Sequence, residues 1–238
     1  MFSFLFQQKP VRPLLADMHA HWLPGVDDGV KTIEESMEVI DRLMELGYEK
    51  LTTTPHIMSD FYGNSSASLK SAFDHFITQI RAKGYTLPLH CAAEYYIDEG
   101  TINLINNVQE LLTFGKGYLL FETNMISEPM QLKDIIFKLT SQGYKPVIAH
   151  PERYQYMTMS KAEDLRNRGV LLQINMLSLI GYYGPTVQKM AARLIDKGWV
   201  DLLGSDCHHI EQGRLLGDVW KTRLFRKASA LPLLNYTL

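Results

Sequence analysis

The chain has 238 residues, which suits one large domain or two small ones and is a common length for a single α/β barrel. Its 24 lysines and arginines against 26 aspartates and glutamates give a formal charge of −2, which argues against the basic surface of a nucleic-acid-binding protein. No stretch approaches about 18 consecutive apolar residues, so we expect no membrane-spanning segment. Cys91 and Cys207 lie outside any CxxC pattern and predict small buried thiols.

We expect residues 1–13 to be an N-terminal extension and residues 14–238 to form a single domain. The extension lacks the positive region and the long apolar run of a signal peptide, so the default location is the cytoplasm. It carries four apolar residues followed by two basic ones: Phe2, Phe4, Leu5, Phe6, Lys9 and Arg12. Contact with the inner face of the membrane is therefore an open alternative to a disordered or locally packed tail.

Six times an amphipathic stretch is followed by a glycine, usually an aromatic residue, and then a short apolar run. Glycine suits the left-handed position that ends a helix, so the pattern predicts helices that lead directly into strands. The junctions are Gly47, Gly84, Gly117, Gly143, Gly169 and Gly198. Thr32 with Glu35, and Ser160 with Glu163, have the spacing of capping boxes. Pro129 and Pro185 stand where a first helical residue would.

Seven short runs of apolar or β-branched residues read as strands buried on both faces, as in parallel sheets. They are 14–16, 51–54, 87–93, 118–121, 146–149, 170–174 and 200–203. Strands and helices alternate throughout, which predicts right-handed βαβ units. A linear doubly wound sheet is possible, but the distribution of polar residues favours a closed or nearly closed barrel.

Every expected strand except the sixth is followed by a residue with metal-ligand chemistry. In a parallel barrel the carboxyl ends of all strands share one rim, so these residues would converge. The set is His19, His21, Asp27 or Asp28, His56, Glu94, Glu122, His150, Asp206 and His208. A single histidine at a strand end is usually structural, so the prediction rests on the coincidence of many. His75 and His90 are interpreted as structural, and His209 as a residue that supports a neighbouring ligand.

A mixed set of histidines and carboxylates suits Zn²⁺, Mn²⁺ or iron rather than Ca²⁺ or Cu(I). Nine ligands are too many for one ion, which implies two or three metals that share a carboxylate. Such a cluster lowers the pKa of a bound water to about 7 and supplies hydroxide. Arg153 and Arg214 would add guanidinium groups that match phosphate oxygens, although each could instead form a surface salt bridge. The pattern therefore indicates hydrolysis of a phosphate ester.

These residues resemble the polymerase-and-histidinol-phosphatase (PHP) superfamily, and more narrowly its capsule-type bacterial protein-tyrosine phosphatases. The matching segments run in order from residue 14 to about 215. They are Asp17-Met-His-Ala-His21, Leu23-Pro-Gly-Val-Asp-Asp-Gly29, Thr54-Pro-His56, Ala93-Glu-Tyr-Tyr96, Glu122, Ile148-Ala-His-Pro-Glu-Arg-Tyr154, Gln173-Ile-Asn175 and Gly204-Ser-Asp-Cys-His208. The second and sixth segments discriminate best for the tyrosine-phosphatase branch.

The resemblance implies a distorted (β/α)7 TIM-like barrel of the PHP fold, with its active site at the C-terminal rim of the strands. It also implies three divalent metals, with manganese expected first and iron or zinc as alternatives. Carried over by motif, one metal would be held by His19, His21, Glu94 and Asp206. Glu94 would bridge to a second metal, completed by Glu122 and His150, and Asp28, His56 and His208 would take the third.

The resemblance further implies a protein-tyrosine phosphatase that hydrolyses phosphotyrosine by metal-bound hydroxide. Arg153 and Arg214 would be its phosphate-binding residues. The expected partner is a bacterial tyrosine kinase that controls capsule or exopolysaccharide synthesis, and assembly into a homo-oligomer is compatible with the family. The family commonly has Asn where His209 stands, which leaves Arg214 as the least secure match. The alternatives are a small-molecule phosphatase of the histidinol-phosphate type and a non-catalytic kinase-binding module.

Several tyrosines in the expected rim segments are candidates to flank a substrate ring, and the sequence does not choose among them. They are Tyr95, Tyr96, Tyr154, Tyr182 and Tyr183. Cysteine-based phosphatase chemistry is not indicated, because the sequence contains no Cys-x5-Arg pattern.

Overall fold

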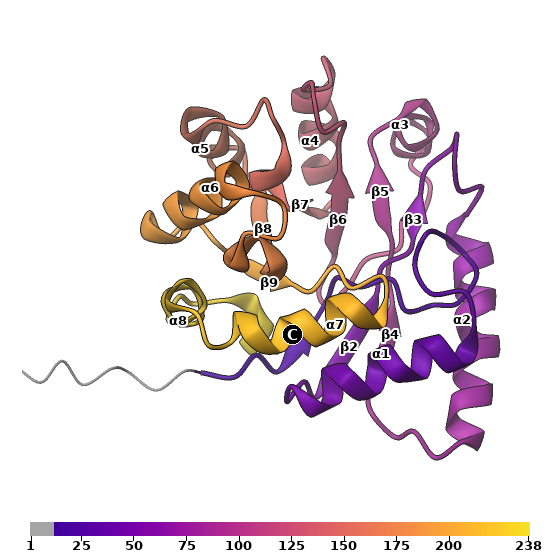
Figure 1. Ribbon diagram of the computed structural model, residues 1–238. Coiled ribbons are helices and arrows are strands. Elements are labelled where there is room, and N and C mark those ends of the chain that lie inside the picture. Colours follow the sequence, from indigo (N-terminus) through magenta and orange to yellow (C-terminus); the bar gives the residue numbers. More distant parts are fainter. Residues whose placement is uncertain (1–11) are drawn as a thin grey trace, which may run out of the picture.

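The computed structural model describes residues 12–238 (Figure 1). The apolar residues and Lys9 of the expected N-terminal extension lie outside that range. Arg12 lies inside it, with its guanidinium carbon 3.5 Å from the centroid of the Tyr236 ring, near the C-terminus. No helix in the described part of the chain is long and apolar enough to cross a membrane.

Nine strands and eight α-helices alternate along most of the described part of the chain. The strands are β1 (Ala16–Asp17), β2 (Lys50–Thr53), β3 (His56–Ile57), β4 (Leu89–Cys91), β5 (Glu94–Tyr96), β6 (Tyr118–Glu122), β7 (Lys145–Ala149), β8 (Leu171–Asn175) and β9 (Leu202–Gly204). The helices are α1 (Ile33–Glu45), α2 (Ser66–Ala82), α3 (Glu99–Asn106), α4 (Leu132–Ser141), α5 (Met159–Asn167), α6 (Pro185–Asp196), α7 (Ile210–Val219) and α8 (Arg223–Ser229). Short 3₁₀ helices cover η1 (Pro151–Arg153), η2 (Met176–Ile180) and η3 (Leu234–Tyr236).

All strand pairs in these elements are parallel, and they form two sheets, with orders β1-β2-β4 and β3-β5-β6-β7-β8-β9. The strands expected at 51–54 and 87–93 correspond to β2 and β4, and each is followed after a short break by a strand that was not predicted, β3 or β5. The first break contains Pro55, which has no N–H to donate to a neighbouring strand. Beyond these breaks, β3 and β5 pair with each other and belong to the larger sheet. Their side chains therefore lie toward the C-terminal end of that sheet.

The two sheets are linked beyond the ends of β1 and β9. Ala20 and Cys207 form a parallel bridge there, and the His21 N–H donates to the Cys207 carbonyl at 2.9 Å. Buried residues of the larger sheet meet residues that directly follow β1 and β4 in one small interior cluster, as in a barrel: Met18, Ala92, Phe114, Leu120, Val147, Ala149 and Leu202. The predicted α/β fold of parallel strands is confirmed. Strand pairing among the described residues does not run around the full ring, because β4 and β3 are sheet edges.

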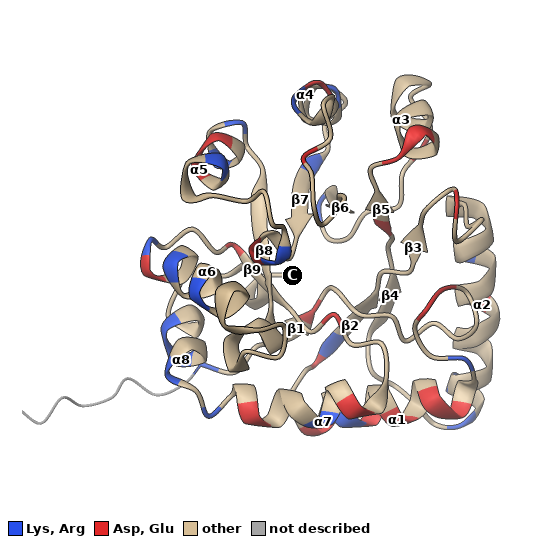
Figure 2. Ribbon diagram, turned by 45° about the horizontal axis from the view of Figure 1, so that its top comes forward, with Lys and Arg blue, Asp and Glu red and all other residues tan. Residues whose placement is uncertain are grey.

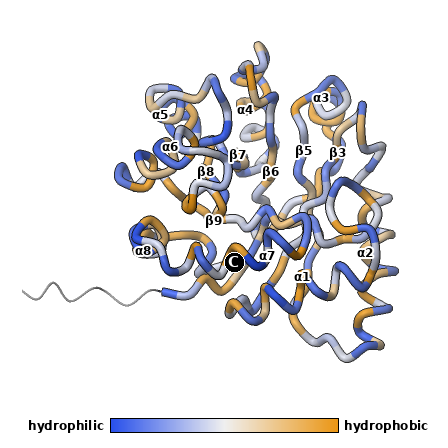
Figure 3. The backbone as a smooth tube through the Cα atoms, viewed as in Figure 1, coloured by the Kyte–Doolittle hydropathy of each residue, from blue (hydrophilic) through white to orange (hydrophobic). Residues whose placement is uncertain are grey.

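The helices cover the outside of the strands with amphipathic faces, and hydrophobic and hydrophilic residues alternate along α1 and α2 in Figure 3. The Thr32–Glu35 capping box is confirmed, and so is Pro185 as the first residue of α6. The other box is wrong, because Thr158 caps α5 by accepting from the Lys161 N–H. Pro129 also does not begin a helix, since α4 starts at Leu132.

The six junction glycines all have positive φ, between 68° and 94°. Five of them follow helices as expected. Gly117 does not, because α3 ends at Asn106 and a loop leads from there to β6. Cys91 and Cys207 are both free and at least partly buried, which confirms the interpretation of the two thiols.

Candidate metal centre

The predicted ligands lie at the C-terminal ends of the strands, the end that Figure 2 turns toward the viewer. His19 and His21 follow β1, Asp28 lies in the loop before α1, and His56 begins β3. Glu94 begins β5 and Glu122 ends β6. His150 directly follows β7, and Asp206 and His208 follow β9. The bridge between the segments after β1 and β9 brings the first and last members of the set side by side.

Three groups of side chains place potential ligand atoms within 4.8 Å of one another. They are His19, His21, Glu94 and Asp206; His21, Asp28, His56 and His208; and His56, Glu94 and Glu122. His150 joins the third group, because its Nε2 lies 3.2 Å from Glu94 Oε1 and 3.8 Å from Glu122 Oε2. The groups share His21, His56 and Glu94, so the nine predicted ligands form one continuous cluster.

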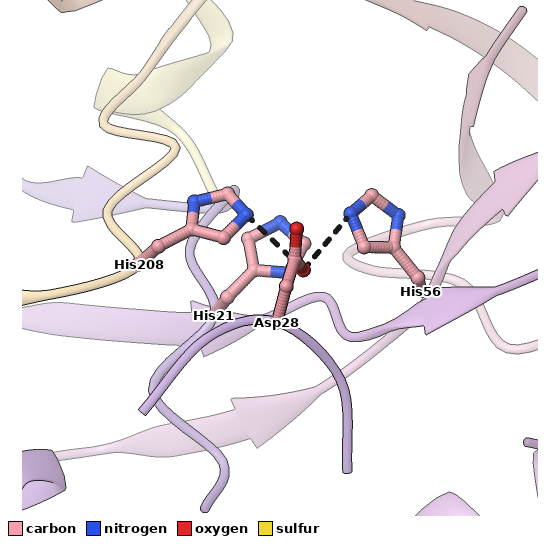
Figure 4. A group of neighbouring side chains, drawn as sticks. All are labelled: His21, Asp28, His56 and His208. Carbon is pink, nitrogen blue, oxygen red and sulfur yellow. Dashed lines mark ion pairs between the residues drawn. The ribbon is translucent and has the colours of Figure 1, made fainter. Parts of the chain in front are cut away.

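Figure 4 shows the second group, in which His56 and His208 reach Asp28 from opposite sides. Both Nε2 atoms lie 3.5 Å from Asp28 Oδ1. The His208 and His21 rings are stacked, with centroids 3.9 Å apart. The Asp28 side chain is half exposed, so this group lies at the solvent side of the cluster, whereas the first group is fully buried.

The structure distinguishes Asp27 from Asp28. Asp27 is buried and points away from solvent: its Oδ2 accepts from His21 Nδ1 at 2.7 Å and from the His56 backbone N–H at 3.1 Å. Its Oδ1 accepts from the Gly29 N–H at 3.0 Å. A Cβ on Gly29 would lie 2.1 Å from the His21 carbonyl oxygen, so this tight loop requires glycine. Asp27 therefore orients two histidines, while Asp28 faces the cluster.

Strand β8 contributes no candidate ligand, and its side chains support the ligands of its neighbours. Gln173 Oε1 accepts from His19 Nδ1 at 2.8 Å. Asn175 Nδ2 donates to Asp206 Oδ2 at 2.8 Å. Hydrogen bonds of this kind fix the orientation and tautomer of a ligand. The sequence placed both residues in a matching segment without indicating these contacts.

Three buried carboxylates and the half-exposed Asp28 lie close together, and the effect of this crowding appears in the pKa of Glu122. Burial, followed by the negative charges of Glu94 and Asp206, raises the pKa of Glu122 well above its usual value. Burial and the Arg153 guanidinium lower the pKa of His150 to about 4, which keeps this imidazole neutral with a free lone pair. Glu94 Oε1 and His56 Nδ1 are buried without a hydrogen-bond partner in the described chain. A buried carboxylate oxygen and a buried imidazole nitrogen that lack hydrogen-bond partners fit bound cations.

A cavity of about 300 Å³ opens above the cluster. Its polar floor is formed by seven charged or histidine residues: Asp28, His56, Glu94, Glu122, His150, Asp206 and His208, with Arg153 at the edge. Its remaining lining residues are Met58, Phe61, Tyr62 and Met125, from the loops after β3 and β6. A larger cavity, of about 520 Å³, lies at the opposite end of the strands and contains none of the nine predicted ligands.

The two predicted phosphate-binding arginines lie in different places. Arg153 lines the site cavity, donates from Nη1 to Asp206 Oδ2 at 2.9 Å, and stacks over the Tyr183 ring at 4.4 Å. Arg214 is exposed on α7 and lines a separate surface cavity beside acidic residues of α1. It is not among the residues that line the site cavity, so its placement does not support the predicted contact with phosphate.

The other histidines stay outside the cluster. His209 is half exposed and pairs with Glu211, with Nδ1 3.0 Å from the carboxylate, so it does not support a ligand. His75 lies on an exposed part of α2, and His90 lines the larger cavity at the opposite end.

Of the rim tyrosines, two are buried with their hydroxyls bonded to backbone. The Tyr95 hydroxyl accepts from the Leu112 N–H at 2.7 Å, and the Tyr154 hydroxyl donates to the Ala149 carbonyl at 2.9 Å. Tyr183 lies against Arg153. The aromatic residues that line the site cavity are instead Phe61 and Tyr62, which the sequence did not single out. The available signal was their place a few residues after His56, in a loop that leaves the same rim.

Comparison with known proteins decides the family. The chain matches the model of the family described as "Capsular polysaccharide synthesis, CpsB/CapC" over residues 15–215. The chain belongs to this family. The match covers every predicted ligand, and it confirms the resemblance to capsule-type tyrosine phosphatases.

Relatives of known name support this assignment. A Staphylococcus aureus protein named "Putative tyrosine-protein phosphatase CapC" is 29% identical over 198 residues, covering 82% of this chain and 78% of that protein. Tyrosine-protein phosphatase YwqE of Bacillus subtilis is 28% identical over 225 residues, covering 93% and 84%. Tyrosine-protein phosphatase CpsB of Streptococcus pneumoniae is 22% identical over 204 residues, covering 83% and 84%.

Solved structures agree with the sequence relatives. The structure reported for YwqE from B. subtilis and CpsB from S. pneumoniae, described as unique metal-dependent tyrosine phosphatases, superposes with a TM-score of 0.74 at 25% identity. It covers 88% of this chain and 89% of that one. The lactonase Lmo2620 of Listeria monocytogenes superposes with a TM-score of 0.56 at 12% identity, covering 96% and 91%, which shows a shared fold alone.

Proposed function

We propose that this protein is a metal-dependent protein-tyrosine phosphatase. The observation that carries the proposal is the convergence of nine histidine and carboxylate side chains in one cluster, seven of which form the floor of one cavity with Arg153 at its edge. The reaction is inferred from the family and from the names of its relatives. The residues that carry it out are inferred from the geometry of this chain.

The proposed centre holds three divalent cations, with Mn²⁺ as the first expectation and iron or zinc as alternatives. His19, His21, Glu94 and Asp206 would hold one; Glu94 would be shared with a second, held also by Glu122 and His150; Asp28, His56 and His208 would hold the third. The groups of ligand atoms within 4.8 Å match the first set as proposed and the third with His21 added. For the second set, support comes from the distances of 3.2 and 3.8 Å between His150 Nε2 and the Glu94 and Glu122 carboxylates. When bound, such ions lower the pKa of water toward 7 and neutralise charge on a phosphoryl group.

Arg153 is proposed to bind the phosphoryl oxygens. Its side chain is one-quarter exposed at the cavity edge, and it is oriented by Asp206 on one side and Tyr183 on the other. A guanidinium fixed in this way presents two N–H groups to phosphate without reorganising during the reaction. A phenolate leaves readily, because its conjugate acid has a pKa near about 10, so the site needs no strong general acid.

The finer points of the proposal concern partner, assembly and location. We propose that the substrate is phosphotyrosine on a bacterial tyrosine kinase that controls capsule or exopolysaccharide synthesis. The family description and the names of the relatives support this choice. A cytoplasmic location and a homo-oligomeric assembly belong to the same proposal.

The test is phosphate release from a phosphotyrosyl peptide and from histidinol phosphate, assayed side by side. Chelated protein, protein restored with Mn²⁺, and the Arg153→Ala variant are compared. We expect manganese-dependent turnover of the peptide, strongly reduced by the substitution. Preference for histidinol phosphate would replace phosphotyrosine with a small molecule as the proposed substrate. Absence of turnover of either compound by metal-loaded protein would point to a non-catalytic module.

A further inference from the structure

The walls of the site cavity differ in character from its floor. The floor is charged, whereas Met58, Phe61, Tyr62 and Met125 supply apolar surface above it. A volume of about 300 Å³ is at the lower limit for small-molecule sites, so the cavity has room for one phosphoaryl group rather than a folded peptide. An ester with a phosphate at one end and a ring at the other matches this division.

Two rings form one side of this wall. The Tyr62 ring stacks on His56, with centroids 5.6 Å apart and planes 13° apart. The Phe61 ring follows at 6.5 Å from Tyr62, inclined by 46°. Phe61 lines the cavity and is nevertheless 71% exposed, so one face of the ring is free to contact a ligand. Aromatic rings prefer partners at centroid distances of about 4.5–7 Å in offset or edge-to-face arrangements.

The turn that carries these rings is held rigidly. The Tyr62 N–H donates to the Met58 carbonyl at 2.8 Å, and the Ser59 N–H donates to Asp98 Oδ2 at 2.7 Å. At its far end, Asn64 Nδ2 donates to the His56 carbonyl at 2.8 Å. A Cβ on Gly100 would lie 1.8 Å from Ser59 Oγ, so the turn is pressed against the start of α3. Such a turn presents its rings without an ordering penalty on binding.

We propose that Phe61, supported by Tyr62, is the residue against which the phenyl ring of phosphotyrosine stacks, and that the turn 58–62 makes the site selective for aryl over alkyl phosphates. The inference rests on the proposed function and assigns the part of the substrate that the metal centre does not contact. The buried tyrosines of the rim do not take this role, because Tyr95 and Tyr154 use their hydroxyls within the core.

The experiment measures binding without turnover. Calorimetry on the manganese-loaded protein gives the affinity for phenylphosphonate, which carries a ring, and for methylphosphonate, which does not. The variants are Phe61→Ala and, as a matched control, Phe137→Ala, whose ring is also 71% exposed but lies on α4 and does not line the site cavity. Metal content and melting temperature confirm that each variant is folded and loaded.

We expect Phe61→Ala to weaken phenylphosphonate binding by about three- to tenfold, the usual contribution of one aromatic contact, and to change methylphosphonate binding less than twofold. Phe137→Ala should match the wild type for both.

Equal weakening of both phosphonates in Phe61→Ala, or no change in either, would overturn the inference. Failure of the proposed function is detected separately, as absence of phosphotyrosyl-peptide turnover by the wild type. In turnover assays, the substitution should raise KM for the peptide and leave kcat within about twofold, because the ring is held equally before and during the reaction.

Discussion

Replacing Asp27 by asparagine tests whether one buried acceptor sets the direction in which His21 presents its lone pair. Although burial raises the pKa of Asp27, the neighbouring His21 outweighs this effect and lowers it, so the group is a carboxylate that only accepts. His21 therefore carries its hydrogen on Nδ1. This leaves Nε2, which lies 3.4 Å from Glu94 and 3.5 Å from Asp206, as the ring atom that would bind a cation in the cluster.

Asparagine cannot accept all three hydrogen bonds that Asp27 accepts. With its oxygen kept toward Gly29, its NH₂ group faces the His21 ring, so the ring hydrogen must move to Nε2 and the lone pair is lost from the cluster. With the amide reversed, the buried Gly29 N–H loses its acceptor, which costs about 1–3 kcal/mol of stability. We expect the first arrangement to weaken metal binding by about 10- to 100-fold, or roughly 1.4–2.8 kcal/mol.

The assay is a titration of the metal-loaded protein with a competing chelator, followed by mass spectrometry of the bound metal. The matched control is Asp196→Asn, an exposed aspartate that pairs with Lys227 at the surface. The control should retain wild-type affinity. Metal affinity of Asp27→Asn within twofold of the wild type would refute the reasoning that His21 depends on this acceptor.

Three further outcomes are expected. Arg153→Lys keeps the charge but loses the planar fork, so kcat/KM for a phosphotyrosyl peptide should fall by at least about tenfold while metal content is unchanged; unchanged kinetics would exclude bidentate phosphate binding. Burial raises the pKa of Glu152 to about 7, so its contribution to stability is present below pH 4.5 and lost as the pH rises through 7. The unfolding free energy of the wild type should therefore fall relative to Glu152→Gln over that window, by up to about 3 kcal/mol in denaturant titrations, and parallel pH profiles would contradict this. Removing metal with a chelator should lower the melting temperature and abolish phosphatase activity, with both restored by Mn²⁺; a melting temperature that does not respond would show that the buried carboxylates need no cation.

The convergence of the ligand set could be predicted from sequence because it follows from topology. Parallel strands that alternate with helices share one carboxyl end, so residues such as His56 and His150 meet although nearly a hundred positions separate them. The positions of histidines and carboxylates after successive strands were enough to place the ligands at this end of the sheet. The sequence also located where most strands begin, because a glycine followed by an apolar run marks these positions locally.

The choice of Asp28 over Asp27 came from the family resemblance and not from the residue pattern, because it depends on which carboxylate the tight loop at Gly29 turns toward the cluster. The same holds for Arg214, which follows the motif in sequence but projects from α7 toward the acidic side of α1. The contribution of Phe61 was missed for a related reason. Its role depends on a turn fixed by Asp98 and Gly100, which lie about forty residues further along the chain.

The backbone at two predicted ligands indicates what the metal centre requires of the fold. His150 and Asp206 are two of only three non-glycine residues in the described chain with positive φ, at 35° and 51°. A left-handed backbone of this kind costs about 1–3 kcal/mol at each position and persists only where the surroundings enforce it. Here Arg153 N–H donates to the His150 carbonyl, and Asp206 N–H donates to the His19 carbonyl. Both side chains are thereby turned toward Glu94 and His19 rather than along their strands. Because bound cations would stabilise the strained arrangement over its relaxed alternatives, the strain at these two positions is an expected cost of assembling the proposed metal centre and not of forming the strands.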